Sequence, residues 1–146
     1  MNRYFILFLL LVLPANSFAL IEVDITRGNL NPLPIAVSPL SIDEDSKKSF
    51  EKIIKKKDIG SEISSVIENN LKISGLFNPL NKDAFLQAPD IANLKPRFED
   101  WNLIKAQALI TGKVEFIDEK LRVEFRLWDV LAGKEMMALA FTTVPN

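Results

Sequence analysis

Histidine and cysteine are both absent from the 146 residues of this sequence. Without cysteine, the chain has no disulfide, no thiol nucleophile, no ligand for an iron–sulfur cluster and no lipid-modified terminal thiol. Without histidine, it has no Ser-His-Asp triad, no imidazole base and no ordinary zinc or haem site. It has five glycines, and none of them belongs to a phosphate-binding G-x-x-x-x-G-K-[ST] loop. We therefore expect a protein that is not an enzyme and that binds no metal or cofactor.

An excess of charge of one sign is also lacking, because 18 Lys+Arg stand against 19 Asp+Glu. A nearly neutral chain produces no overall field that would attract nucleic acid or an anionic membrane. The length fits one domain, and a domain of this size buries enough surface to be stable without disulfides.

The first nineteen residues have the three-part layout of a secretory signal peptide. A short positive start at residues 1–3 precedes ten apolar residues at 4–13, and residues 17–19 form a small-x-small cleavage signature. A membrane anchor is the alternative, but a spanning helix needs about 20 apolar residues, and this run ends at Pro14. We expect cleavage between Ala19 and Leu20, and an exported mature chain with no membrane-inserted segment.

The mature chain begins with a clean alternation of apolar and polar residues. Ile21, Val23 and Ile25 alternate with Glu22 and Asp24, which is the period of a half-buried strand. Prolines at positions 32 and 34 keep it from forming a hairpin with the next strand. We expect residues 20–33 to form an N-terminal strand and tether, followed by a domain at 34–146. Such a strand can add to the edge of a partner's sheet. The alternative, favoured by the alternation alone, is pairing within its own domain.

Periodicity predicts two helices and several strands in that domain. Residues 35–37 fit a short buried strand, and a helix is expected from its cap at Asp58 to Gly75. A short strand follows from Leu76, residues 82–94 are irregular, and a second helix begins near Pro96. The apolar stripe of the first helix consists of Ile59, Ile63, Val66, Ile67 and Leu71.

Three alternating strands close the sequence. Gly112 interrupts the first, where we expect a bulge or a close contact. Met137, Leu139 and Phe141 fill one face of the third. The order of elements predicts an α+β fold, in which a single mixed sheet is packed by two helices on one face and ends in an antiparallel meander.

A charged segment at residues 41–57 is first acidic and then basic. It predicts a weak helix around residues 46–54. A basic patch for an anionic partner is one interpretation, and a solvated surface segment is the other. We favour the second, because no aromatic residues are interleaved with the lysines.

Candidate catalytic and binding residues are few. The acids of the pair Glu99–Asp100 are adjacent, so on a helix they point about 100° apart. The run Asp43–Asp45 has no apolar flank that could raise a pKa, and we expect solvated surface for both pairs. Trp101 and Trp128 could form an aromatic platform for sugars, but both occupy positions where a core aromatic is expected. The sequence predicts no catalytic group of residues.

Four stretches, in their order and spacing, resemble the TolB family of periplasmic proteins of the Tol-Pal system of Gram-negative bacteria. The matching stretches are the mature start at 21–28, the run at 34–40, the helix end with its following strand at 71–80, and residues 98–101 with 108–112 and 126–130.

The resemblance implies an α+β amino-terminal domain that precedes a six-bladed β-propeller. In this family the propeller binds the lipoprotein Pal, and the extreme mature N-terminus binds the inner-membrane protein TolA. A non-enzymatic periplasmic adaptor is implied, which links TolA and Pal and supports outer-membrane integrity and constriction at cell division. The TolA-binding segment, carried onto this sequence, is Leu20, Ile21, Glu22, Val23, Asp24 and Ile25.

The sequence departs from the family pattern because it contains no blade-like repeat of about 40 residues. It is either a fragment of a longer protein, truncated before a propeller, or a stand-alone domain, and we favour the fragment. Pal binding therefore falls on no residue here, and the segment at 43–57 is longer than is usual in the family. The alternative function is a small periplasmic ligand-binding or cell-wall-binding domain that uses an exposed Trp101 or Trp128.

Overall fold

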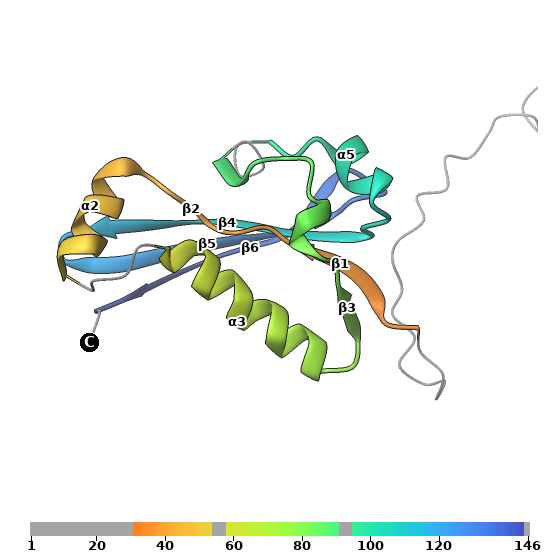
Figure 1. Ribbon diagram of the computed structural model, residues 1–146, viewed down its shortest axis with the longest axis horizontal. Coiled ribbons are helices and arrows are strands. Elements are labelled where there is room, and N and C mark those ends of the chain that lie inside the picture. Colours follow the sequence, from red (N-terminus) through yellow and green to blue (C-terminus); the bar gives the residue numbers. More distant parts are fainter. Residues whose placement is uncertain (1–30, 54–57, 91–94, 145–146) are drawn as a thin grey trace, which may run out of the picture.

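The computed structural model describes residues 31–53, 58–90 and 95–144 (Figure 1). The predicted signal peptide and the predicted strand that begins at Leu20 lie outside the described residues. The elements are β1 (Leu33–Val37), β2 (Ser41–Ile42), α2 (Glu44–Ile53), α3 (Ile59–Ile73), β3 (Phe77–Pro79), the 3-10 turn η1 (Lys82–Ala84), α5 (Phe98–Leu103), β4 (Ala108–Ile117), β5 (Lys120–Asp129) and β6 (Lys134–Thr143).

The strands of the described residues form one mixed sheet in the order β3-β1-β4-β5-β6, with β2 paired to β4. β1 lies parallel to both β3 and β4, whereas β4, β5 and β6 follow one another as antiparallel neighbours. The predicted α+β class, the mixed sheet and the closing meander are therefore confirmed.

Gly112 lets β4 approach β5 closely. A Cβ atom at this position would lie 2.2 Å from the carbonyl oxygen of Glu124 and 3.2 Å from Cγ of Leu40. The register of β4 against β5 is continuous, so the structure shows the close contact and not the bulge. An irregularity occurs instead between β5 and β6, at Leu127/Trp128.

Three α-helices occur among the described residues, where the predicted fold class has two. α3 has the predicted limits: the carboxylate of Asp58 accepts a hydrogen bond from the amide of Ser61 (3.0 Å), and Gly75 has a φ of +73°. α5 is the second predicted helix, and it is only six residues long. α2 is the third helix, and it lies in the charged segment, where a weak helix around residues 46–54 was predicted.

The charged side chains of α2 are exposed, as the interpretation as solvated surface predicted, but one side of this helix is buried. Phe50 is buried and meets the ring of Phe116 edge-on at 5.6 Å, and Ser46, one turn earlier, is buried as well. Residues four apart share one side of a helix, so this side packs on β4 while the lysines stay outside. A single aromatic among many charges was too weak a pattern to predict that contact.

Helices cover both faces of the sheet, and not one face as predicted (Figure 1). Phe50 of α2 and Ile63 of α3 pack with Val114. Trp101 of α5 packs with Leu109, and residues 109 and 114 point to opposite faces because strand side chains alternate. Each face has its own cluster of buried apolar side chains.

Candidate interaction site

β6 is an edge strand of the described sheet, at the end opposite β3, and all ten of its residues are exposed. Leu139 and Phe141 remain 48% and 57% exposed although they belong to the apolar side of the strand. An edge strand with a bare apolar side is unusual in a soluble protein, because it invites pairing and burial. We use the name β6 apolar face for the side chains of Phe125, Leu127, Met137, Leu139 and Phe141, which the pairing of β5 with β6 places on one side of the sheet.

A hollow of about 230 Å³ lies between this face and α3. Ile67 of α3 forms one wall, Leu127 and Met137 form the other, and Arg126 is the one charged residue in the lining. The hollow is thus a groove for apolar side chains and offers few partners to a polar ligand.

The opposite side of β4, β5 and β6 carries charged residues that pair with one another. Glu115 accepts hydrogen bonds from Lys113 (2.8 Å) and Arg122 (3.1 Å), and Arg122 also pairs with Glu124. The hydrogen bond from Lys113, reinforced by Arg122, lowers the pKa of the Glu115 carboxyl. Since these charges already compensate one another, this side has little net charge for an ionic ligand.

The predicted acidic pair at 43–45 has a structural role. The Asp43 carboxylate accepts hydrogen bonds from the amides of Asp45 (3.1 Å) and Ser46 (2.8 Å) and from the Ser46 hydroxyl (2.6 Å). These bonds, chiefly the one from the Ser46 hydroxyl, lower the pKa of Asp43. The Ser46 hydroxyl in turn accepts a bond from the amide of Phe116 (2.8 Å), which joins the start of α2 to β4.

The other acidic pair and the lysines also make local contacts. Asp100 pairs with Arg97 (2.6 Å), and Glu99 beside it is exposed. Lys47 and Lys48 of α2 lie 3.9 Å and 3.6 Å from acidic residues three positions earlier. Within the described residues, no group of three or more carboxylates is placed to hold a metal ion, and none of the helices is long and apolar enough to cross a membrane.

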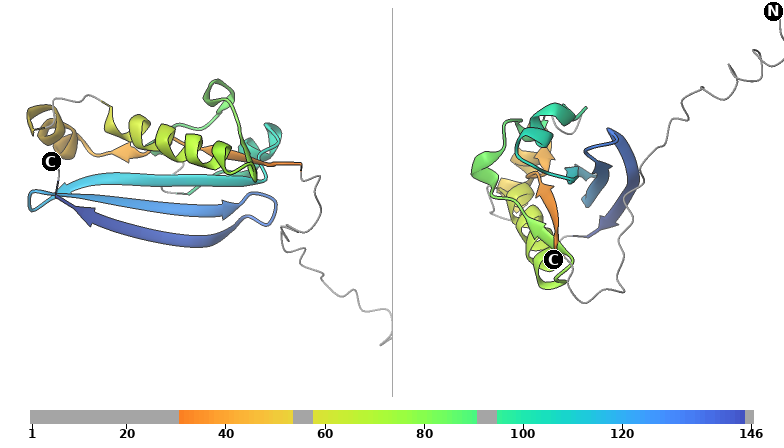
Figure 2. Two further views of the ribbon diagram at one scale, coloured as in Figure 1. Left: turned by 90° about the horizontal axis from the view of Figure 1, so that it is seen from below. Right: turned by 90° about the vertical axis from the view of Figure 1, so that its right-hand side faces the viewer.

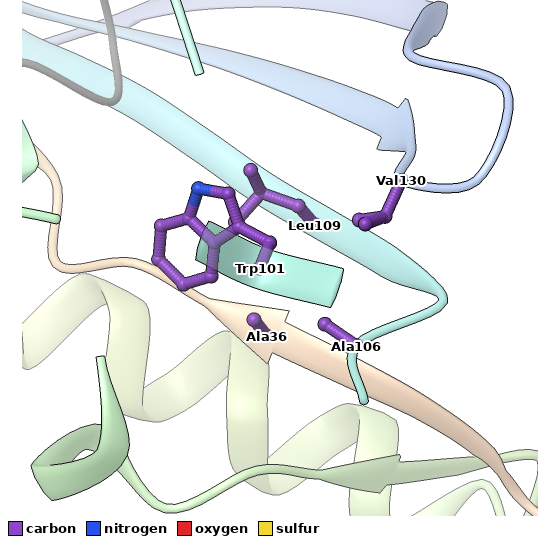
Figure 3. Close-up of a cluster of buried hydrophobic side chains, with 5 residues drawn as sticks. All are labelled: Ala36, Trp101, Ala106, Leu109 and Val130. Carbon is purple, nitrogen blue, oxygen red and sulfur yellow. The ribbon is translucent and has the colours of Figure 1, made fainter. Parts of the chain in front are cut away.

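Trp101 does not form a surface platform. It is 1% exposed, lies among small and branched side chains, and meets the ring of Phe85 edge-on at 5.0 Å (Figure 3). Its indole nitrogen donates to Oε1 of Gln87 at 2.8 Å. Trp128 is half-buried, and its indole nitrogen donates to the hydroxyl of Thr111 at 2.9 Å. A sugar site built on an exposed Trp101 is therefore ruled out.

Comparison with known proteins identifies the family. The family model of the TolB amino-terminal domain matches residues 21–136, which is most of the chain. The chain belongs to the TolB amino-terminal domain family. A curated relative from Pelagibacter ubique, named Tol-Pal system protein TolB, is 79% identical over 145 residues. The match covers 99% of this chain and 32% of that relative, so the chain spans about a third of the relative's length.

Solved structures show the same fold as this TolB domain. Crystalline TolB from Acinetobacter baumannii superposes with a TM-score of 0.55 at 18% identity, over 78% of this chain and 23% of that one. The C-terminal domain of LpoB from Escherichia coli superposes equally well, with a TM-score of 0.55 at 11% identity, over 82% of this chain and 87% of that domain. At such low identity these likenesses concern the fold alone.

The TolB family match begins at Ile21, inside the predicted TolA-binding segment. That segment, Leu20 to Ile25, lies outside the described residues, so its assignment stays a prediction. The β6 apolar face is a feature that the sequence did not predict as a surface. Alternation showed that one side of this strand is apolar, but the same pattern is typical of a covered strand.

Proposed function

We propose that the chain is the amino-terminal part of an exported, non-enzymatic Tol-Pal system protein that works in the periplasm. The observation that carries this proposal is the identity of 79%, over nearly the whole chain, to a protein named for that system. The apolar run at residues 4–13 and the cleavage signature at 17–19 support export. The mass of the exported protein tests this part: it should correspond to a chain that begins at Leu20, and an intact Met1 would contradict it.

We further propose that residues 20–25 bind TolA by adding a strand to a sheet of that partner. Their alternation suits strand addition, in which main-chain hydrogen bonds provide affinity. The base of the tether is held firmly: the amide of Leu33 donates to the carbonyl of Leu76 (2.9 Å), and β1 lies between β3 and β4. The proposed tether therefore joins the domain at an interior strand of the sheet.

Capture of the mature protein by the TolA periplasmic domain tests this proposal. Deletion of residues 20–28 should abolish capture. Val23→Pro should weaken it by roughly tenfold or more, since proline removes one main-chain donor from the ladder. Val23→Thr is the matched control, because threonine keeps the β-branched shape and the amide, and capture should persist. Undiminished capture of the deletion variant would place the TolA site elsewhere.

The link to Pal belongs to the longer protein. We propose that the part of a TolB protein beyond this chain binds Pal, and that the two contacts together support outer-membrane integrity and constriction at division. In cells that lack TolB, the whole protein should restore resistance to detergent, and the same protein without residues 20–28 should not. Equal rescue by both would contradict the adaptor role.

A further inference from the structure

The first and last strands of the described residues enter and leave the sheet at opposite ends. β1 is parallel to β4, and β4, β5 and β6 alternate in direction, so β1 and β6 run the same way. In the left view of Figure 2, β1 (orange) accordingly begins at the right end of the sheet and β6 (dark blue) ends at the left end. A ten-residue strand extends over roughly 33 Å, whereas the three strand spacings from β1 to β6 add up to about 14 Å. A pull between the two ends therefore acts mainly along the strands.

β1 is bonded to β3 on one side. The amide of Leu33 donates to the carbonyl of Leu76 (2.9 Å). Two residues later, the carbonyl of Ile35 accepts a hydrogen bond from the amide of Leu80 (2.9 Å). These bonds enclose a parallel pairing that begins at the first residue of β1, so the strand is held from the point where the tether joins it.

β1 is bonded to β4 on its other side. The carbonyl of Pro34 accepts a hydrogen bond from the amide of Gln107 (3.0 Å), and the amide of Ser38 donates to the carbonyl of Ile110 (2.9 Å). The residues at 35–37, between these two bonds, are at most 1% exposed. Water is thus kept away from the main chain of β1, and buried hydrogen bonds of this kind are stronger than exposed ones.

The direction of a pull decides how these hydrogen bonds are loaded. The bonds between strands lie across the strand direction, so a pull along β1 strains the bonds on both of its sides together. A pull that lifts β1 away from β4 at one end strains the first bond before the next. The same strand should therefore resist the first pull much better than the second.

We propose that the domain bears mechanical load, with β1 as the strand that resists a pull on the mature N-terminus and β6 as the strand that passes the pull to the polypeptide beyond it. The inference rests on the proposed function, in which TolA holds residues 20–25 and the rest of a TolB protein follows this chain. An adaptor that links two membranes is under tension whenever they move apart.

The pairing of β1 is the shortest on the path of the load. β1 pairs with β3 and with β4 over three positions each, whereas β4 and β5 pair over ten. The ladder between β5 and β6 extends from Asp129 and Lys134 to Leu121 and Thr143. Mechanical rupture should therefore begin at β1, and the three strands of the meander should stay together until β1 has left the sheet.

The absence of cysteine makes the test direct, because introduced thiols are the only attachment points for handles in a single-molecule pulling experiment. Asn31→Cys with Val144→Cys attaches the handles at the start of β1 and after the end of β6, and loads the strands lengthwise. Asn31→Cys with Gln107→Cys attaches both at the same end of the sheet, where Gln107 bonds β1, and lifts β1 from β4. All three positions are exposed, so both double variants of residues 20–146 should melt at the same temperature.

We expect an unfolding force roughly twofold or more higher for the lengthwise pair than for the lifting pair at the same pulling speed, because forced unfolding follows the unfolding rate in each direction. Equal melting temperatures make thermodynamic stability the same in both experiments, so a difference in force reports the direction of the load. Equal forces, or a lower force for the lengthwise pair, would overturn the proposal.

A second pair of variants tests whether β1 is the resisting strand. Ser38→Pro removes the amide that bonds Ile110 and should lower the lengthwise force, whereas Ser38→Ala keeps the amide and should leave it nearly unchanged. A folded Ser38→Pro variant with an unchanged lengthwise force would contradict the role of β1. The handles take the place of TolA, so failure of TolA capture and failure of this proposal are distinguishable.

Discussion

At the scale of single residues, two glycines are required for different physical reasons. Gly112 has no space for a side chain, since a Cβ would meet the Glu124 carbonyl oxygen at 2.2 Å. Gly75 has free space around it, but its φ of +73° is a conformation that other residues rarely adopt. We predict that Gly112→Ala lowers the free energy of unfolding by about 3 kcal/mol, because β4 and β5 must separate.

Gly75→Ala is the comparison for this prediction. It should cost only about 1 kcal/mol, which is the penalty of the left-handed backbone without a clash. Urea unfolding of both variants measures the difference. Equal losses would show that β4 and β5 adapt to the added methyl group.

Two leucines allow the stability contribution of a buried side chain to be compared with that of an exposed one. Leu109 of β4 is fully buried in a cluster with Trp101 of α5, whereas Leu139 is 48% exposed on the β6 apolar face. We predict that Leu109→Ala destabilises the chain by about 3 kcal/mol, through lost burial and a cavity. Leu139→Ala should cost less than about 1 kcal/mol, because little of its surface is removed from water. Calorimetric melting of residues 20–146 measures both, and a comparable cost at Leu139 would mean that the face is covered within this chain.

At the scale of elements, the start of α2 depends on one carboxylate. Asp43 accepts two amide hydrogen bonds and one hydroxyl hydrogen bond, and these lower its pKa in the folded state. A carboxyl whose pKa is lower in the folded than in the unfolded state contributes stability above its unfolded pKa of about 3.9, and loses it as pH falls through the folded value.

We therefore predict that Asp43→Ala loses about 1 kcal/mol at neutral pH, as expected for a removed helix cap. The difference from the unchanged protein should disappear when the pH falls well below the lowered pKa of Asp43. Asp43→Asn is the matched control, because it keeps an accepting oxygen without the charge, and it should lose less. Denaturant titrations at several pH values measure this, and a difference that grows on acidification would contradict the sign.

The elements also show where sequence reasoning succeeds and where it stops. α3 was predictable, because its stripe, its Asp58 cap and its terminal Gly75 all indicate the same helix. The burial of Phe50 was not predictable, because a single aromatic residue among charged residues gives no periodic apolar pattern. Alternation identifies an apolar side of β6 but not whether anything covers it. The side of the sheet on which each helix packs is a tertiary property, which periodicity does not contain.

At the scale of the whole molecule, the described residues form their sheet without the N-terminal segment. β1 lies in the interior, paired with β3 and β4, and its hydrogen bonds are made within residues 31–144. Alternation predicts a strand at residues 20–25, the family resemblance implies that this strand binds TolA, and the described residues begin after it. Whether this segment pairs with a partner's sheet or with its own sheet can therefore be tested by measuring how much it stabilises the domain.

We predict that a chain beginning at Asn31 unfolds at the same temperature as a chain beginning at Leu20, because β1 makes its sheet pairings within the described residues. A loss of about 1 kcal/mol would lower the midpoint by roughly 2–8 °C in a domain of this size, which calorimetry resolves easily. Leu33→Pro is the positive control, since it removes the amide that bonds Leu76 and should lower the midpoint. A lower midpoint for the chain beginning at Asn31 would mean that residues 20–30 pair within their own domain. TolA would then have to compete with that pairing, and its affinity for the mature protein would fall by the same free energy.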